Sequence, residues 1–164
     1  IMPDKITALK LSLINSCMSE DKIADKILEY NKNTEQYGLI LTEQQALALS
    51  RTQTAALKKS GRIELGNGIA GKLIDAFSDS PYISDSTYEN ILHELINLFY
   101  YYKNETWDTV SDSDLVDFMK NSFNGCCRGS VELLAEEALP ALAYHIHSGQ
   151  AFNTFRFDKE SHNE

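Results

Sequence analysis

The stretch STYENILHELINLFYYYKNE, residues 86–105, decides the fold because it is the longest run with a single helical register. Its apolar side chains recur at steps of three and four residues, so they share one face of an α-helix. They are Tyr88, Ile91, Leu92, Leu95, Leu98, Phe99 and Tyr102.

 Ser86 and Glu89 have the spacing of a capping box, which predicts that the helix begins there. Because a helix with so wide an apolar stripe is not stable alone in water, we expect other elements to pack around it.

The segments on either side of this stretch also have helical patterns. Thr42 with Gln45 and Ser111 with Asp114 are two further capping boxes, and each precedes an apolar periodic run. The first 18 residues fit either a helix or a strand, and we favour the helix. The other helices are expected over residues 19–33, 42–60, 69–79, 111–124 and 130–148.

Together these patterns predict an all-α fold: one domain over residues 1–164, built as a bundle of six or seven helices around the central long helix. Short extended pieces at 39–41 and around Phe155 and Phe157 remain open alternatives. Pro140 lies inside the last helical pattern and is expected to kink or split it. Residues 1–18 and 158–164 are expected to be peripheral or frayed.

Composition excludes several classes of function. The chain has 15 Lys and Arg against 24 Asp and Glu, a net charge of −9. Such an acidic chain is poorly suited to nucleic acid or to an anionic membrane surface. No run approaches the roughly 20 apolar residues of a membrane span, and the first residues do not resemble a signal peptide. Three cysteines, two of them adjacent, do not suggest a disulfide framework, so a cytoplasmic location is expected.

A glycine-rich segment offers a candidate ligand site. Residues 66–72, GNGIAGK, match the first seven places of the phosphate-binding loop G-x-x-x-x-G-K, but a leucine stands where that loop needs Ser or Thr. An anion could bind here to backbone N–H groups at a helix start, with Arg62, Gly66, Gly68 and Lys72 as its contacts. The alternative is that the glycines only let the chain turn and begin the next helix.

No other group of residues has the pattern of a catalytic or metal centre, so we expect no metal and no cofactor. Glu89 and His93 are four apart on the central helix, but they are expected on its polar face as ordinary surface residues. Cys126 and Cys127 lack a second pair at zinc spacing. One of them is expected to be buried at a helix junction, and a reactive thiol is the alternative.

Tyr100 and Tyr101 lie outside the main apolar stripe of the central helix. Tyrosine is favoured in protein interfaces because it brings a large area and a polar tip at low entropic cost. The pair is therefore a candidate interface, and the alternative is that a neighbouring helix covers it.

Five groups of residues stand out as signature segments: Gly38–Glu43, Gly61–Glu64 with Gly66 and Gly68, Asp79–Ile83, Phe99–Glu105, and Gly125 with Cys127, Gly129 and Ser130. Together they resemble a family of small bacterial proteins with a domain of unknown function. The likeness covers about residues 35–130 and implies a bacterial, cytoplasmic protein without an assigned activity.

These observations favour a non-catalytic helical protein that acts by binding another protein or a second copy of itself. The alternative is a protein or enzyme that binds a small anion or phosphate ligand through the segment 61–72.

Overall fold

The computed structural model describes residues 20–64 and 68–156 of the chain, and within these ranges every regular element is a helix. The all-α prediction is therefore confirmed, and the helix expected over the first 18 residues lies outside the described part. After a helix over residues 20–29, the elements are α2 (Asn31–Thr34), a 3-10 turn (Glu35–Tyr37), α3 (Glu43–Lys59), α4 (Ala70–Phe77), α5 (Asp85–Glu105), α6 (Asp112–Asn124), α7 (Val131–Leu133), a π-helical turn (Leu134–Ala138), α8 (Leu139–His147) and a 3-10 turn (Phe152–Thr154).

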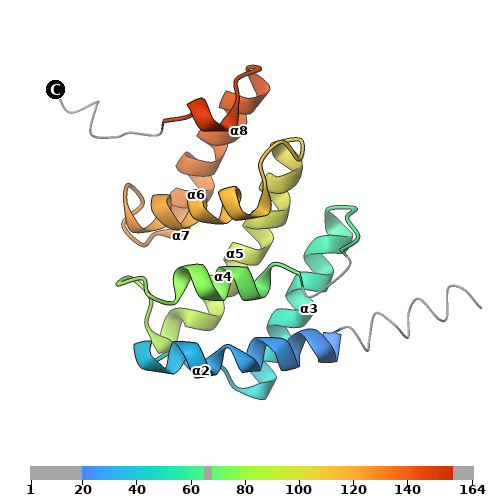
Figure 1. Ribbon diagram of the computed structural model, residues 1–164, viewed down its shortest axis with the longest axis vertical. Coiled ribbons are helices and arrows are strands. Elements are labelled where there is room, and N and C mark those ends of the chain that lie inside the picture. The colour runs from blue at the N-terminus through green and yellow to red at the C-terminus, as the bar shows by residue number, and fades with distance from the viewer. Residues whose placement is uncertain (1–19, 65–67, 157–164) are drawn as a thin grey trace, which may run out of the picture.

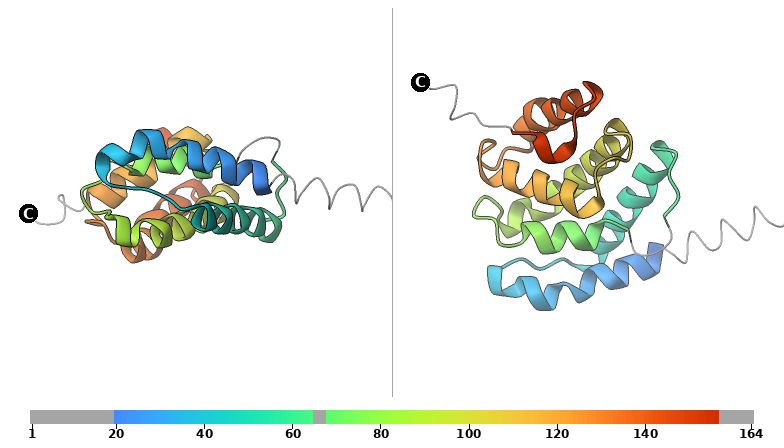
Figure 2. Two further views of the ribbon diagram at one scale, coloured as in Figure 1. Left: turned by 90° about the horizontal axis from the view of Figure 1, so that it is seen from below. Right: turned by 45° about the horizontal axis from the view of Figure 1, so that its top comes forward.

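The helices form three stacked hairpins (Figure 1). The first joins residues 20–37 to α3, the second joins α4 to α5, and the third joins α6 to α7 and α8. One layer contains α2, α4 and α6, and the other contains α3, α5 and the α7–α8 segment (Figure 2). Stacked helix pairs of this kind bury one continuous core between their layers.

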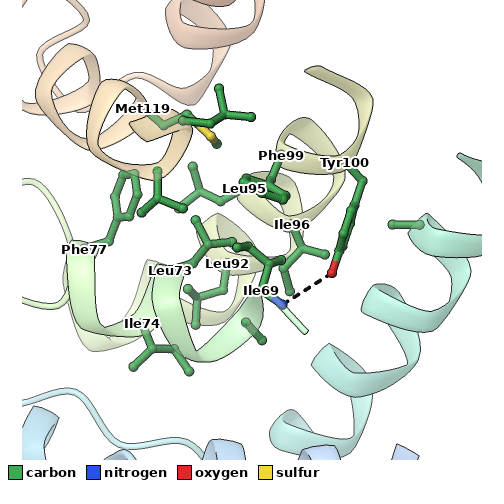
Figure 3. Packing of buried hydrophobic residues seen from close by; sticks show 14 of the residues in the cluster. Ile69, Leu73, Ile74, Phe77, Leu92, Leu95, Ile96, Phe99, Tyr100 and Met119 are labelled. Atoms are coloured by element: carbon green, nitrogen blue, oxygen red, sulfur yellow. Dashed lines mark hydrogen bonds between the residues drawn. The ribbon is translucent and has the colours of Figure 1, made fainter. Parts of the chain in front are cut away.

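Helix α5 is the centre of this core, as its apolar stripe predicts. It contacts α3, α4, α6, α7 and α8. Figure 3 shows its side chains meeting those of α4 and α6. Burial extends beyond the predicted stripe, because Ile96, Tyr100 and Lys103 are also buried, whereas Ile91 and Leu98 are only half-buried. No helix of residues 20–64 and 68–156 is long and apolar enough to cross a membrane.

All three predicted helix caps lie in the described residues, and Ser111 caps α6 by accepting the backbone N–H of Asp114 at 3.1 Å. Thr42 and Gln45 form the predicted capping box, with each side chain accepting the other's backbone N–H. The prediction of a cap at Ser86 is wrong: α5 begins two residues earlier, where Ser84 and Thr87 form the reciprocal pair. Thr87 takes the place that Glu or Gln usually has in a capping box, and the earlier start adds Asp85 to the first turn, where its charge interacts favourably with the helix dipole.

Pro140 splits the last helix, as expected. The chain makes a five-residue π-helical turn directly before α8, and Pro140 occupies the first turn of α8. A wider turn removes the need for the backbone N–H that proline lacks, so the chain continues with little change in direction.

Candidate functional site

Helix α5 ends in a turn that places the only tryptophan of the chain on the surface. The N–H of Asp108 donates to the carbonyl of Lys103 at 3.1 Å, and the N–H of Trp107 donates to the carbonyl of Asn104 at 2.8 Å. These two bonds define a Schellman motif, in which the residue after the C-cap adopts a left-handed conformation and is usually glycine. Here that residue is Trp107, with φ 57°, and Asp108 follows with φ 58°. Two consecutive non-glycine residues therefore hold a conformation that side chains disfavour.

Arg62 supports this turn from the α3–α4 connection. Its guanidinium donates two hydrogen bonds to the Asp108 carboxylate, at 2.8 and 3.1 Å, and a third to the side-chain carbonyl of Asn104 at 2.8 Å. The Asn104 amide in turn donates to the carbonyl of Ser60. Since the planar fork of arginine matches a carboxylate in one orientation, the contact fixes the position of Asp108.

A buried lysine holds the turn from the other side. The ammonium of Lys103 donates to the carbonyl of Val110 and pairs with Asp112 at 2.9 Å. Val110 is buried and Asp112 begins α6, so Lys103 joins the end of α5 to the start of α6. The turn that carries Trp107 is thus fixed on both sides by charged hydrogen bonds.

Exposed aromatic side chains occur in the last part of α5 and on α8, whose His147 contacts this turn. The ring of Trp107 stacks on that of His147 with centroids 4.5 Å apart, and His147 also hydrogen-bonds the Glu105 carbonyl. Trp107 is 61% exposed, Tyr101 55% and Tyr144 77%. We call these four residues, Tyr101, Trp107, Tyr144 and His147, the aromatic surface. Single exposed aromatic residues are common, but exposed apolar side chains that gather on one surface are typical of interaction sites, and aromatic residues are enriched in interfaces.

Carboxylates accompany the aromatic surface. Asp108 follows Trp107 directly, and its side chain is about half exposed. The hydrogen bond from Arg62 lowers the pKa of Asp108, so this carboxylate keeps its charge even in mildly acidic solution. Glu105 lies one helical turn after Tyr101 on the same side of α5. The surface thus combines aromatic rings with negative charge.

In the segment predicted to bind an anion, two backbone N–H groups bond to side chains of the protein itself. The N–H of Ile69 donates to the hydroxyl of Tyr100 at 3.3 Å, as Figure 3 shows, and the N–H of Ala70 donates to the buried amide of Gln53 at 2.9 Å. Gly68 packs so closely on Gln53 that a Cβ there would lie 2.0 Å from its amide nitrogen. Gly68 thus leaves room for the Gln53 side chain, which caps α4. This resembles the alternative interpretation, in which the glycines only let the chain turn and begin the next helix.

Arg62 and Lys72, the two basic residues predicted at the anion site, lie in separate environments. Arg62 binds Asp108 and Asn104, as described above. Lys72 is exposed and lines a hollow of about 290 Å³ between α4 and α6, whose wall also contains Asp75 and Asp117. Gly66 lies outside the described residues. An anion at this segment stays a prediction, but it would meet two carboxylates beside Lys72.

The two tyrosines predicted as an interface have opposite environments. Tyr101 is exposed, whereas Tyr100 is fully buried, so Tyr100 is not available to a partner in this fold. The Tyr100 hydroxyl donates to Glu64 at 2.8 Å. Burial, together with the neighbouring Glu64 carboxylate, raises the pKa of Tyr100 far above its ordinary value. Burial likewise raises the pKa of Glu64, although the Tyr100 hydrogen bond opposes this effect.

Glu89 and His93 are closer to the core than the helical pattern suggests. One ring nitrogen of His93 lies 3.0 Å from Glu89, and the other lies 2.6 Å from the hydroxyl of Thr52 on α3. Both side chains are less than one third exposed, so the pair joins α3 to α5. No group of three metal-ligating side chains occurs in the part of the chain that the structure describes.

Sequence reasoning missed Trp107, Tyr144 and His147. Residues 107–110 fall between the helices predicted over 86–105 and 111–124, so no role is predicted for Trp107. The available signal was that a single tryptophan stands in a polar turn after a helix, where glycine is normally expected. Tyr144 and His147 belong to the polar side of the last helix, and only the packing of α8 beside α5 brings them to the same surface.

The chain belongs to a family of unknown function, DUF6323, whose profile matches residues 26–152. This confirms the resemblance to a domain of unknown function. The matched range includes the second and third hairpins, the first hairpin except for residues 20–25, and all four residues of the aromatic surface. Comparisons with curated proteins and with solved structures found no match.

Proposed function

We propose that this protein binds a partner protein through the aromatic surface, and that the partner contributes basic side chains. The observation that carries the proposal is the conformation of Trp107. Glycine would suit this position of the turn better, and burial does not compensate, because the ring is mostly exposed. Backbone strain of this kind persists where a side chain has a role that stability alone does not explain.

The chemistry of the surface favours a basic partner over a second copy of the chain. Arginine and lysine side chains stack on the faces of tryptophan and tyrosine, and Asp108 and Glu105 add a favourable charge. A symmetric dimer through this surface would bring the same carboxylates of two chains together, each chain with a net charge of −9. Electrostatic repulsion therefore opposes self-association here.

Because Trp107 is the only tryptophan, intrinsic fluorescence reports on the proposed surface directly. We expect its emission to change saturably on titration with a short peptide that alternates arginine with aromatic residues. The effect should weaken as salt is added, and a glutamate peptide of equal length should have none. No change with the basic peptide at millimolar concentration would contradict the proposal.

Photo-crosslinking in the cells that make the protein tests the same surface without a chosen peptide. A photoreactive amino acid at Tyr144 should give a defined hetero-complex, whereas the same residue at Tyr37 should not. Tyr37 is a suitable control because it is also exposed, at 49%, but it lies in the first hairpin. A crosslinked homodimer, or equal products at both positions, would overturn the proposal.

Binding of a small phosphate ligand at residues 61–72 is the alternative function. The bonds of Ile69 and Ala70 to Tyr100 and Gln53 argue against it, because these N–H groups are already used. A thermal-shift series with inorganic phosphate and nucleotides tests it. A saturable rise in Tm that disappears in Lys72→Ala would favour this function over the one proposed here.

A further inference from the structure

We propose that Cys126 and Cys127 form a reversible thiol modification site, at which a hydroperoxide converts the two thiols into a disulfide between neighbouring residues. The two sulfur atoms lie 3.9 Å apart in the connection between α6 and α7. This connection is separate from the aromatic surface, so the inference does not depend on the proposed function.

The two cysteines differ in access in the way that such a reaction requires. Cys126 is half-buried, and its thiol points to the carbonyl of Ser122 at 3.7 Å. Cys127 is only 2% exposed and forms part of the core. A peroxide can therefore reach Cys126 first, and Cys127 is protected from solvent while remaining next to the Cys126 sulfur.

The reaction would proceed in two balanced steps. The Cys126 sulfur, as thiolate, attacks one oxygen of the peroxide; the O–O bond breaks, and the other oxygen leaves as an alcohol or water after taking a proton. The sulfur of Cys127 then attacks the sulfenic acid sulfur of Cys126. The S–O bond breaks, and hydroxide leaves and takes the Cys127 thiol proton to form water. Overall, the two thiols lose two protons and two electrons, and the peroxide is reduced.

The geometry of neighbouring residues makes the product easy to reduce again. A trans peptide holds adjacent Cα atoms about 3.8 Å apart, whereas disulfides usually join Cα atoms about 4.4 to 6.8 Å apart. The bond would therefore be strained, and strained disulfides are the labile ones found in redox regulation.

The surrounding connection is built from turns that link both helix ends. The N–H of Cys127 donates to the carbonyl of Ser122 in α6, and the carbonyl of Cys127 accepts from Ser130. The Ser130 hydroxyl caps α7 by accepting from the N–H of Leu133. Formation of the disulfide between Cys126 and Cys127 would therefore strain the hydrogen bonds at the end of α6 and at the cap of α7.

The test uses the full chain with Cys17→Ser, so that only the two neighbouring thiols can react. After treatment with hydrogen peroxide and then a thiol alkylating reagent, we expect a mass loss of about 2 Da and no alkylation at either cysteine. Dithiothreitol should restore both alkylation sites. Addition of oxygen to Cys126 without loss of 2 Da, two unreacted thiols, or a disulfide-linked dimer would each overturn the inference.

Single substitutions establish the order of the steps. In Cys127→Ala, Cys126 should be trapped by dimedone or proceed to the sulfinic acid, because no thiol is present to resolve the sulfenic acid. In Cys126→Ser, the buried Cys127 should stay a thiol over the same period. Equal oxidation of Cys127 in this second variant would contradict the proposed order of attack.

Discussion

The guanidinium of Arg62 and the carboxylate of Asp108 are joined by two hydrogen bonds, although 46 residues separate them in the chain. Arg62 stands in the α3–α4 connection and Asp108 in the α5–α6 turn, so the contact joins two connections at one end of the stacked hairpins. It holds Asp108 in a left-handed conformation next to Trp107. The residue that sequence reasoning assigned to an anion site thus supports the aromatic surface.

Replacing Arg62 by lysine should loosen this turn. Lysine retains the charge but cannot make the paired hydrogen bonds to Asp108 and the third to Asn104. Because Asp108 is about half exposed, we expect a loss of only about 1 kcal/mol in the free energy of unfolding. Urea unfolding measures this, and Arg51→Lys on the exposed side of α3 is the control. Equal free energies of unfolding for the two variants would show that the paired hydrogen bonds of Arg62 do not stabilise the protein.

Two substitutions separate the effect of the left-handed backbone at Trp107 from the effect of its side chain. Both Trp107→Gly and Trp107→Ala remove the ring and its stacking on His147. Only glycine also removes the strain of the left-handed backbone, so it should be more stable than alanine by about 1 kcal/mol. Thermal unfolding followed by circular dichroism gives the difference. Both variants should lose binding to the basic peptide, measured by calorimetry.

Tyr100 and Tyr101 form a matched pair for testing the buried hydroxyl. Tyr100→Phe removes the acceptor of the Ile69 N–H and the donor to Glu64, which should lower the free energy of unfolding by about 1–3 kcal/mol. Tyr101→Phe removes an exposed hydroxyl and should change it by less than about 0.5 kcal/mol. Denaturant unfolding of the two variants in parallel is the measurement. A larger loss of stability in Tyr101→Phe than in Tyr100→Phe would contradict the burial of Tyr100 and the exposure of Tyr101.

Gly68 should be less tolerant of a side chain than Gly61, although both have positive φ. Alanine at either position carries the strain of a left-handed residue. At Gly61 the added Cβ meets open space, whereas at Gly68 it meets the Gln53 amide that caps Ala70. We expect Gly68→Ala to be less stable than Gly61→Ala by about 1–2 kcal/mol. Hydrogen exchange at the Ala70 amide should also become faster in Gly68→Ala only.

Glu64 should make stability depend on pH in the direction opposite to most carboxylates. Its pKa in the folded protein is raised above the ordinary value of 4.5, chiefly by burial. As pH rises from the ordinary pKa towards the raised pKa, Glu64 loses its proton in the unfolded chain before it does in the folded protein. The free energy of unfolding therefore falls with rising pH. Glu64→Gln retains an acceptor for Tyr100 without this penalty. The variant should have a higher Tm than the parent at neutral pH, and the difference should vanish below the ordinary pKa.

The sequence predicted the helices well because their signals are local. Apolar steps of three and four residues, the Thr42–Gln45 box and Pro140 each act within one or two turns of backbone. The start of α5 was misplaced by two residues, because Ser86 with Glu89 has the usual capping-box pattern whereas the helix begins after Ser84, which pairs with Thr87. For Tyr100 the sequence left both an interface and cover by a neighbouring helix open, because the helical period assigns a face but not how many helices surround it, and the structure buries this residue.

By itself the sequence determined an all-helical chain organised around residues 86–105, because periodicity and caps depend on near neighbours. Only the tertiary structure decided which polar groups meet: Arg62 with Asp108, Tyr100 with Glu64, and Trp107 with His147. These contacts join residues far apart in the chain, and their formation depends on how the hairpins stack. No local pattern contains that information, and the aromatic surface, which the stacking creates, could not be read from the sequence.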